Sequence, residues 1–145
     1  MTVQVLLVED HLLLRQAYRR LIDKEEDMEV VGEAGDGPEA IELSHHLEPD
    51  VVLMDISMPI LNGIEATLQI RQNQSMVKVL GVSIHRELQY IHRMLEAGAS
   101  GYVIKDEVVA ELIPAIRTVM SNESYLSSSV GEILCKNAKK PVLDR

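Results

Sequence analysis

The stretch most suited to chemistry is a run of four apolar residues that leads into a carboxylate. Residues 51–54 show no polar alternation, which is typical of a strand buried on both faces of a parallel sheet. Asp55 follows directly. Because open parallel sheets have their ligand crevice at the carboxyl ends of the strands, we expect Asp55 to serve chemistry rather than packing.

Each of three other expected strands also leads into polar side chains. The carboxyl ends of parallel strands share one edge of a sheet, so we expect these side chains to meet Asp55 in one crevice. They are Glu9 and Asp10 after residues 3–8, Ser83 after residues 77–82, and Lys105 after residues 101–104.

The chemistry of such a crevice depends on its charges. Three crowded carboxylates repel one another and favour a bound cation. Hard oxygen ligands without a nearby Cys or His pair favour Mg²⁺ over zinc or copper. With Lys105 as a second positive charge and the Ser83 hydroxyl as a hydrogen-bond donor, Asp55 is suited to receive a phosphoryl group.

The elements that position these residues alternate along the chain. Five expected strands alternate with five helices, which predicts an α/β fold with a parallel sheet and right-handed crossovers. A flavodoxin-like, doubly wound (βα)5 sheet in the order 2-1-3-4-5 is the obvious candidate. The expected strands cover residues 3–8, 28–34, 51–54, 77–82 and 101–104, and the helices begin near residues 11, 37, 63, 87 and 108.

Apolar residues at helical spacing are expected to face the core of this fold. Among these inward-facing residues are Ala17 in the first helix, Leu68 in the third and Val109 in the fifth.

Composition narrows the range of functions. The 145 residues suit one domain with a short extension. A formal charge of −9 and the absence of Phe and Trp argue against nucleic-acid binding by this chain. Cys135 is the single cysteine and cannot form an internal disulfide. With no leader-like terminus and no run of the ~20 apolar residues that span a bilayer, we expect a cytoplasmic protein without a membrane partner.

Four ordered motifs resemble the receiver domain of two-component response regulators. They are Val-Glu-Asp-His at 8–11, Met-Asp-Ile-Ser-Met-Pro at 54–59 with Asn62 and Gly63, Val-Ser at 82–83, and Ala-Gly-Ala-Ser-Gly-Tyr-Val-Ile-Lys-Asp at 97–106. The resemblance covers roughly residues 2–121. Because Asp106 rather than proline follows Lys105, the chain resembles the subfamily that carries a LuxR-type (NarL-type) helix-turn-helix output domain.

The resemblance implies a role for each site residue. Asp55 would accept a phosphoryl group from a sensor histidine kinase, forming a 4-aspartylphosphate. Lys105 would pair with the phosphate. The implied Mg²⁺ ligands are Glu9, Asp10, Asp55 and the Ser57 backbone carbonyl; the switch pair is Ser83 and Tyr102; and Ser57 and His85 would set the dephosphorylation rate. Glu9 stands where many relatives have Asp, so it would reach the metal either directly or through water.

Phosphorylation would, by the same resemblance, act on a second part of the domain. The switch would repack the face made by the fourth helix, the fifth strand and the fifth helix, favour a homodimer and control transcription. Leu88, Tyr90 and Met94 are candidate contacts on that face. The chain would catalyse only its own phosphorylation and dephosphorylation, and is not expected to be an enzyme acting on other substrates.

We expect a receiver domain over residues 1–121 and a connector over residues 122–145. Ser127 is suited to cap a short helix carrying Val130, Ile133 and Leu134, followed by a basic linker from Lys136 to Lys140. No output domain follows in these residues, so DNA would be reached only through a domain outside them. The chain is then either a receiver fragment or a protein that signals without such a domain.

Two other functions compete with this interpretation. A haloacid-dehalogenase-like phosphatase also uses an aspartyl nucleophile, but it needs a second Asp two residues later, where Ser57 stands here. Its nucleophile also follows the first strand rather than the third. The other alternative is a receiver fold that is never phosphorylated and serves only for docking. The full set of site residues argues against it. His11, His45, His46, His85 and His92 lack metal-ligand spacing and are expected to be solvated or on helix surfaces.

Overall fold

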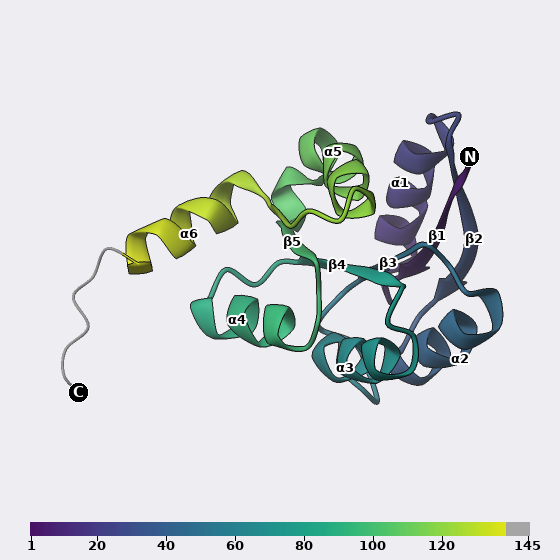
Figure 1. Cartoon of the computed structure of the whole chain (residues 1–145), viewed down its shortest axis with the longest axis horizontal. Coiled ribbons are helices and arrows are strands. Elements are labelled where there is room, and N and C mark those ends of the chain that lie inside the picture. The colour runs from purple at the N-terminus through teal and green to yellow at the C-terminus, as the bar shows by residue number, and fades with distance from the viewer. Residues whose placement is uncertain (139–145) are drawn as a thin grey trace.

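A central parallel sheet with helices on both faces forms the protein (Figure 1). The computed structural model describes residues 1–138, and residues 139–145, including the end of the expected basic linker, lie outside the described residues. Helices α1 and α5 cover one face of the sheet, and α2, α3 and α4 cover the other. The elements are β1 (Val3–Val8), α1 (Leu12–Asp23), β2 (Met28–Ala34), α2 (Gly37–Leu47), β3 (Val51–Met54), α3 (Gly63–Asn73), β4 (Lys78–Ser83), α4 (Leu88–Glu96), β5 (Gly101–Ile104), the 3₁₀ turn η1 (Lys105–Glu107), α5 (Val108–Met120), β6 (Tyr125–Leu126) and α6 (Ser128–Ala138).

The strand order confirms the predicted fold and adds one strand to it. The sheet runs β2-β1-β3-β4-β5-β6, and every pair of neighbours is parallel. β1 lies between β2 and β3, so the chain changes its direction of progress across the sheet next to β1 and β3. That switch point is where open α/β sheets form their ligand crevice.

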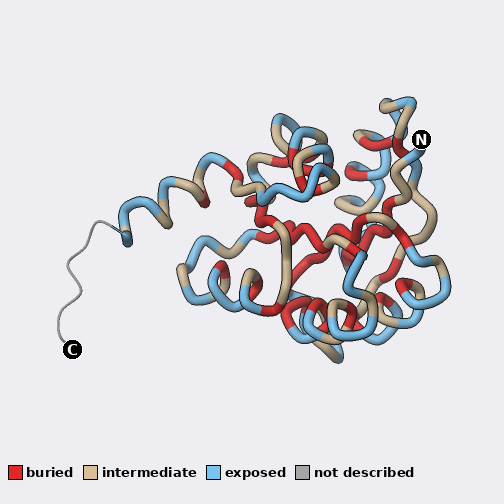
Figure 2. Tube along the Cα trace, in the orientation of Figure 1, coloured by how far each residue is buried: buried red, intermediate tan, exposed pale blue. Residues whose placement is uncertain are grey.

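The central strand β3 is buried on both faces, as its uninterrupted apolar run predicted. Val52 and Met54 pack into the core beneath α2, α3 and α4, whereas Val51 and Leu53 pack into the core beneath α1 and α5. Figure 2 shows the buried residues concentrated along the strands and the inward faces of the helices. β3 is therefore a fixed support for the residue that follows it.

Three residues that were predicted to face the core are exposed, and one that was predicted to lie on the surface is buried. Ala17 is exposed on α1, Leu68 is 36% exposed on α3 and Val109 is 84% exposed on α5. In α5, Val108, Leu112, Ala115, Ile116 and Val119 already fill the stripe that faces the sheet, and Val109 lies beside that stripe. Met94, expected as a surface contact on α4, is fully buried, with its sulfur 3.7 Å from the Thr67 hydroxyl.

The described residues after α5 are part of the packed structure, although the sequence predicted only a connector there. β6 adds to the sheet beside β5 through Tyr125 and Leu126. The Val130 side chain of α6 is fully buried in the core, and so is Ser127. Ile133 and Leu134 of α6 pack against the same core as partly buried residues, and the C-terminal end of α6 extends away from the body of the domain (Figure 1).

No helix within residues 1–138 combines the length and the apolar character needed to cross a bilayer.

Candidate functional site

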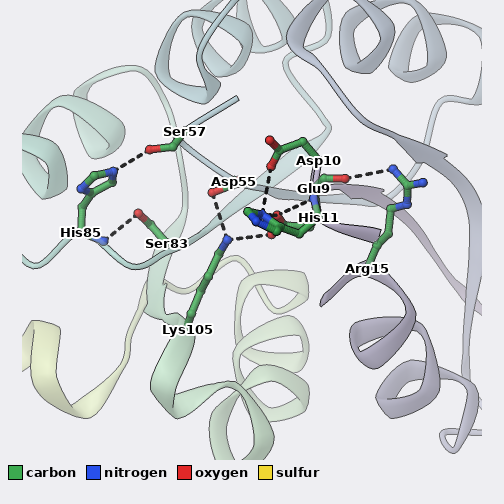
Figure 3. A network of polar contacts seen from close by, with 9 residues as sticks. All are labelled: Glu9, Asp10, His11, Arg15, Asp55, Ser57, Ser83, His85 and Lys105. Atoms are coloured by element: carbon green, nitrogen blue, oxygen red, sulfur yellow. Dashed lines mark hydrogen bonds and ion pairs between the residues drawn. The ribbon is translucent and has the colours of Figure 1, made fainter. Parts of the chain in front are cut away.

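The polar residues predicted to converge do lie together at the carboxyl edge of the sheet (Figure 3). Glu9 follows β1 and Asp55 follows β3, and both are buried. Ser83 ends β4, and Lys105 begins η1 directly after β5. The strand order therefore brings residues from distant parts of the sequence into one crevice.

Lys105 joins the two buried carboxylates. Its Nζ atom lies 2.8 Å from Oε1 of Glu9 and 3.4 Å from Oδ1 of Asp55. The Lys105 side chain is only 11% exposed, so water screens these ion pairs weakly. One ammonium group thus faces two carboxylates, and the crevice keeps an excess of negative charge.

Burial and this excess of negative charge both perturb the protonation of Asp55. Burial raises its pKa from the ordinary 3.8, the Glu9 carboxylate raises it further, and Lys105 offsets only part of the rise, so the pKa lies at about 7. A carboxyl group with so high a pKa holds its proton where an exposed one has lost it. A cation placed beside Asp55 would relieve the same repulsion.

The donor atoms of the crevice suit a hard divalent cation. Among the described residues, carboxylate oxygens of Glu9 and Asp10 and a ring nitrogen of His11 lie within 4.8 Å of one another. Carboxylate oxygens are the ligands that Mg²⁺ prefers, so the residues present fit this ion. Asp55 adjoins the group through Lys105, which contacts both Asp55 and Glu9.

His11 was not expected near the acidic pair. Its Nδ1 atom lies 3.6 Å from both Glu9 Oε2 and Asp10 Oδ1, while its side chain is 73% exposed. The Glu9 side chain also accepts a hydrogen bond from the His11 backbone N–H at 3.1 Å. The sequence did contain a signal for this position, because His11 directly follows Asp10. Arguments from the spacing of metal ligands do not consider such direct neighbours.

The backbone around Asp55 is held from two sides. Its N–H donates to the Val8 carbonyl at 3.1 Å, and the Gly63 N–H donates to the Ile56 carbonyl at 2.8 Å. A Cβ on Gly63 would stand 1.9 Å from the Asp55 carbonyl oxygen, so the return of the chain into α3 requires glycine. Asn62 then caps α3 by accepting from the Glu65 N–H at 3.0 Å.

Ser83 and Tyr102, the expected switch pair, both contact the backbone of His85. The Ser83 hydroxyl oxygen accepts from the His85 N–H at 3.0 Å, and the Tyr102 hydroxyl donates to the His85 carbonyl at 2.8 Å. Both side chains are fully buried, and burial raises the pKa of Tyr102 to about 12. The Tyr102 ring therefore occupies the inward position in this structure.

Ser57 and His85, predicted separately, are in direct contact. The Ser57 Oγ and His85 Nε2 atoms lie 2.6 Å apart, and the imidazole stacks on Tyr90 with ring centroids 4.3 Å apart. The β3–α3 and β4–α4 loops are thus joined at the mouth of the crevice (Figure 3).

Arg15 is a supporting residue that the sequence did not reveal. Its guanidinium donates to the Glu9 backbone carbonyl at 2.9 Å and pairs with Glu33 on β2, also at 2.9 Å. These contacts fix the chain where it leaves β1 and so help to position the acidic pair.

Comparison with known protein families gives an unambiguous assignment. The model of the response regulator receiver domain matches residues 5–117, which is most of the chain. The chain belongs to the response regulator receiver domain family.

Individual relatives agree with this assignment of the receiver domain. The transcriptional regulatory protein DegU of Brevibacillus brevis is 39% identical over 97% of this chain and 59% of its own length. The response regulator GacA of Pseudomonas viridiflava is 36% identical over 96% of this chain and 65% of its own length. The solved structure of a LuxR-family two-component response regulator from Aurantimonas sp. SI85-9A1 is 36% identical, with a TM-score of 0.93 over 97% of this chain and 100% of that one.

These matches separate the receiver domain from its phosphatase rival. Asp55 follows β3, whereas the rival places its nucleophile after the first strand, and the family match is to receivers. The chain spans only about three fifths of the length of the curated relatives it matches. The activities of a whole regulator are therefore proposals for this chain.

Proposed function

We propose that this receiver domain is a phospho-accepting switch in which Asp55 takes a phosphoryl group from a sensor histidine kinase. One observation carries the proposal: Asp55 is buried at the end of β3, with Lys105 Nζ 3.4 Å from its Oδ1 and Glu9 beside the same ammonium. A carboxylate needs nearby positive charge to approach a phosphoryl group, because both are anionic.

The residues of the crevice would divide the work of the transfer. A carboxylate oxygen of Asp55 attacks phosphorus, the bond from phosphorus to the donor histidine nitrogen breaks, and an acyl phosphate forms on Asp55. Lys105 then pairs with the phosphoryl oxygens, and Ser83 donates a hydrogen bond to one of them. We assign the Mg²⁺ ligands as Glu9, Asp10, Asp55 and the Ser57 carbonyl; the ion would neutralise charge on the transferred group.

The same residues would govern how long the switch stays on. We propose that Ser57 and His85, joined at 2.6 Å, flank the path of the water that hydrolyses the acyl phosphate. The chain would thus catalyse only its own phosphorylation and dephosphorylation. Ser83 and Tyr102 would report the phosphoryl group to α4, β5 and α5 by changing their contacts with His85.

The output of the switch would lie outside this chain. The relatives are longer than the receiver, and one of them is named as a transcriptional regulatory protein. We propose that residues 1–121 act as the receiver and residues 122–145 as a connector, and that a phosphorylated homodimer controls transcription through a DNA-binding domain beyond them. We also propose that the chain acts in the cytoplasm.

A direct test uses a small phosphodonor. The chain is incubated with acetyl phosphate, with and without Mg²⁺, and intact and peptide masses are measured. We expect a Mg²⁺-dependent gain of about 80 Da on Asp55, absent from the Asp55→Asn variant. No adduct would favour the docking-module alternative, and continuous turnover of phosphate esters would favour a phosphatase.

A further inference from the structure

Three consecutive side chains of η1 extend to three different parts of the molecule. Lys105 pairs with Glu9 and Asp55 in the crevice. Asp106 accepts from Arg86 of the β4–α4 loop at 3.0 Å. Glu107 accepts from Ser129 at the start of α6. A single 3₁₀ turn therefore links the acceptor site to the C-terminal helix.

The first turn of α6 is held by carboxylates from another part of the chain. The first N–H groups of a helix have no partner within the helix, and a residue just before it usually supplies one. Here the Ser127 hydroxyl, which precedes α6, instead accepts from the Ile104 N–H of β5 at 3.1 Å. The N–H groups of Ser128 and Ser129, the first two residues of α6, instead donate to side-chain carboxylates from α5 and η1.

Glu107 and Glu111 make this contact. The Ser129 N–H and hydroxyl donate to Glu107 Oε2 at 3.0 and 2.8 Å. The Ser128 N–H donates to Glu111 Oε2 at 3.2 Å, and its hydroxyl donates to the same atom at 2.8 Å. We call these four residues the α6 cap. Negative charge here also complements the positive end of the helix dipole.

Apart from the α6 cap, apolar packing on one side of the helix holds α6. Val130 is its one buried residue among those described, and the partly buried Ile133 and Leu134 pack against the same core. The C-terminal end of the helix extends away from the body (Figure 1). Glu111 is anchored by the Tyr125 hydroxyl of β6 at 2.7 Å, so its half of the cap has a second support. Glu107 has no such anchor among the described contacts and lies two residues from Lys105.

We infer that η1 transmits phosphorylation of Asp55 to α6 by weakening the Glu107 half of the α6 cap. The inference rests on the proposed function. A phosphoryl group on Asp55 gives Lys105 stronger partners than Glu9, and the ammonium turns toward them. Lys105 and Glu107 belong to one hydrogen-bonded turn, so a shift of Lys105 moves η1 and carries Glu107 away from Ser129. The contact of Glu111 with Ser128 meanwhile holds the start of α6 in place.

Amide hydrogen exchange at Ser128 and Ser129 tests the inference. It is measured on the whole chain, with Mg²⁺ and the phosphoryl mimic beryllofluoride present or absent, in wild type, Glu107→Ala and Glu132→Ala. Glu132 is an exposed acid on α6 and serves as the matched control. Without the mimic, we expect Glu107→Ala to speed Ser129 exchange about fivefold, the effect of losing a helix cap, and Glu132→Ala to leave it unchanged.

With the mimic bound, wild-type Ser129 exchange should rise by a similar factor, Ser128 should change less, and Glu107→Ala should show no further rise. Fluorine NMR reports separately whether the mimic occupies Asp55. Occupancy with unchanged Ser129 exchange would overturn the inference and leave the proposed function intact. Absence of occupancy would overturn both, and unaltered Ser129 exchange in unliganded Glu107→Ala would overturn the α6 cap itself.

Discussion

The Ser57 hydroxyl and the His85 imidazole lie 2.6 Å apart across the mouth of the acceptor crevice, although 28 residues separate them in the chain. Stacking on Tyr90 holds the imidazole from its other side. The β3–α3 and β4–α4 loops are therefore joined by two side chains that can separate, and under the proposed function an attacking water would pass between them.

Breaking this contact should shorten the life of the phosphorylated state. In Ser57→Ala the imidazole loses its partner, and water reaches the acyl phosphate more freely. We expect dephosphorylation to be roughly 2- to 10-fold faster, the range of one modest hydrogen bond. The rate is followed by the loss of phosphorylated mass after the phosphodonor is removed. Ser121→Ala, at the end of α5, is the matched control, and an equal rate in both variants would refute the role of Ser57.

Asp55→Asn should stabilise the metal-free protein at neutral and higher pH. The folded-state pKa of Asp55 is about 7, above the ordinary 3.8, so between these values the native state holds a proton that the unfolded state has lost. Stability therefore falls as pH rises through this window. Asparagine removes the titrating group, so the variant should exceed wild type by on the order of 1–3 kcal/mol at pH 8.

Urea unfolding in a chelator at pH 4, 6 and 8 measures this effect. The difference between Asp55→Asn and wild type should nearly vanish at pH 4, where Asp55 is neutral in the folded state. Asp106→Asn, which changes an exposed carboxyl group, should show no such trend. A difference that did not depend on pH would contradict the assignment of the raised pKa to Asp55.

Asp10→Ala should weaken Mg²⁺ binding by about tenfold or more, because it removes a hard oxygen donor from the acidic pair. Phosphorylation by acetyl phosphate should slow in parallel. Calorimetric titration with Mg²⁺ provides the measurement. His11→Ala is a sharp control, since its nitrogen lies in the same cluster but is a poor ligand for Mg²⁺. Equal losses of affinity in the two variants would mean that the cluster does not bind the ion through carboxylates.

Gly63→Ala should destabilise the fold, because the new Cβ would stand 1.9 Å from the Asp55 carbonyl oxygen. The clashing atoms are backbone atoms of residues 55 and 56, which have little room to move. We therefore expect the free energy of unfolding to fall by about 2–4 kcal/mol. Gly131→Ala on α6 is the opposite case, with nothing within 4 Å of its Cβ. Removing a helical glycine there should be neutral or stabilise by up to about 1 kcal/mol. Thermal unfolding of both variants separates the two effects.

The sequence predicted secondary structure well where a run of consecutive apolar residues is buried. The apolar run before Asp55 was enough to predict β3. The alternation of elements predicted a parallel α/β sheet, and its obvious candidate order, 2-1-3-4-5, is confirmed. β6 escaped prediction because two residues are too short to show a period, and its position depends on pairing with β5. Helical spacing predicted the inward faces but not their width, so Val109 was wrongly expected to be buried.

The sequence predicted which residues lie in the site better than it predicted the contacts between them. Strand ends are set by topology, so the convergence of Glu9, Asp55 and Lys105 followed from the order of the sheet. Contacts between loops depend on side-chain rotamers, which no spacing rule specifies. The pairing of Ser57 with His85 and that of Glu107 with Ser129 therefore emerged only from the three-dimensional arrangement.

The short strand β6 also bears on self-association. A parallel sheet that ended at β5 would present unpaired backbone groups, and such an edge recruits strands from other molecules. β6 covers it: the Tyr125 N–H donates to the Ser100 carbonyl at 3.1 Å, and the Ser127 N–H donates to the Tyr102 carbonyl at 3.0 Å. Gly101 permits this close approach, since a Cβ there would stand 2.4 Å from the Tyr125 carbonyl oxygen. A chain cut at residue 121 would keep its acceptor site and gain an aggregation-prone edge.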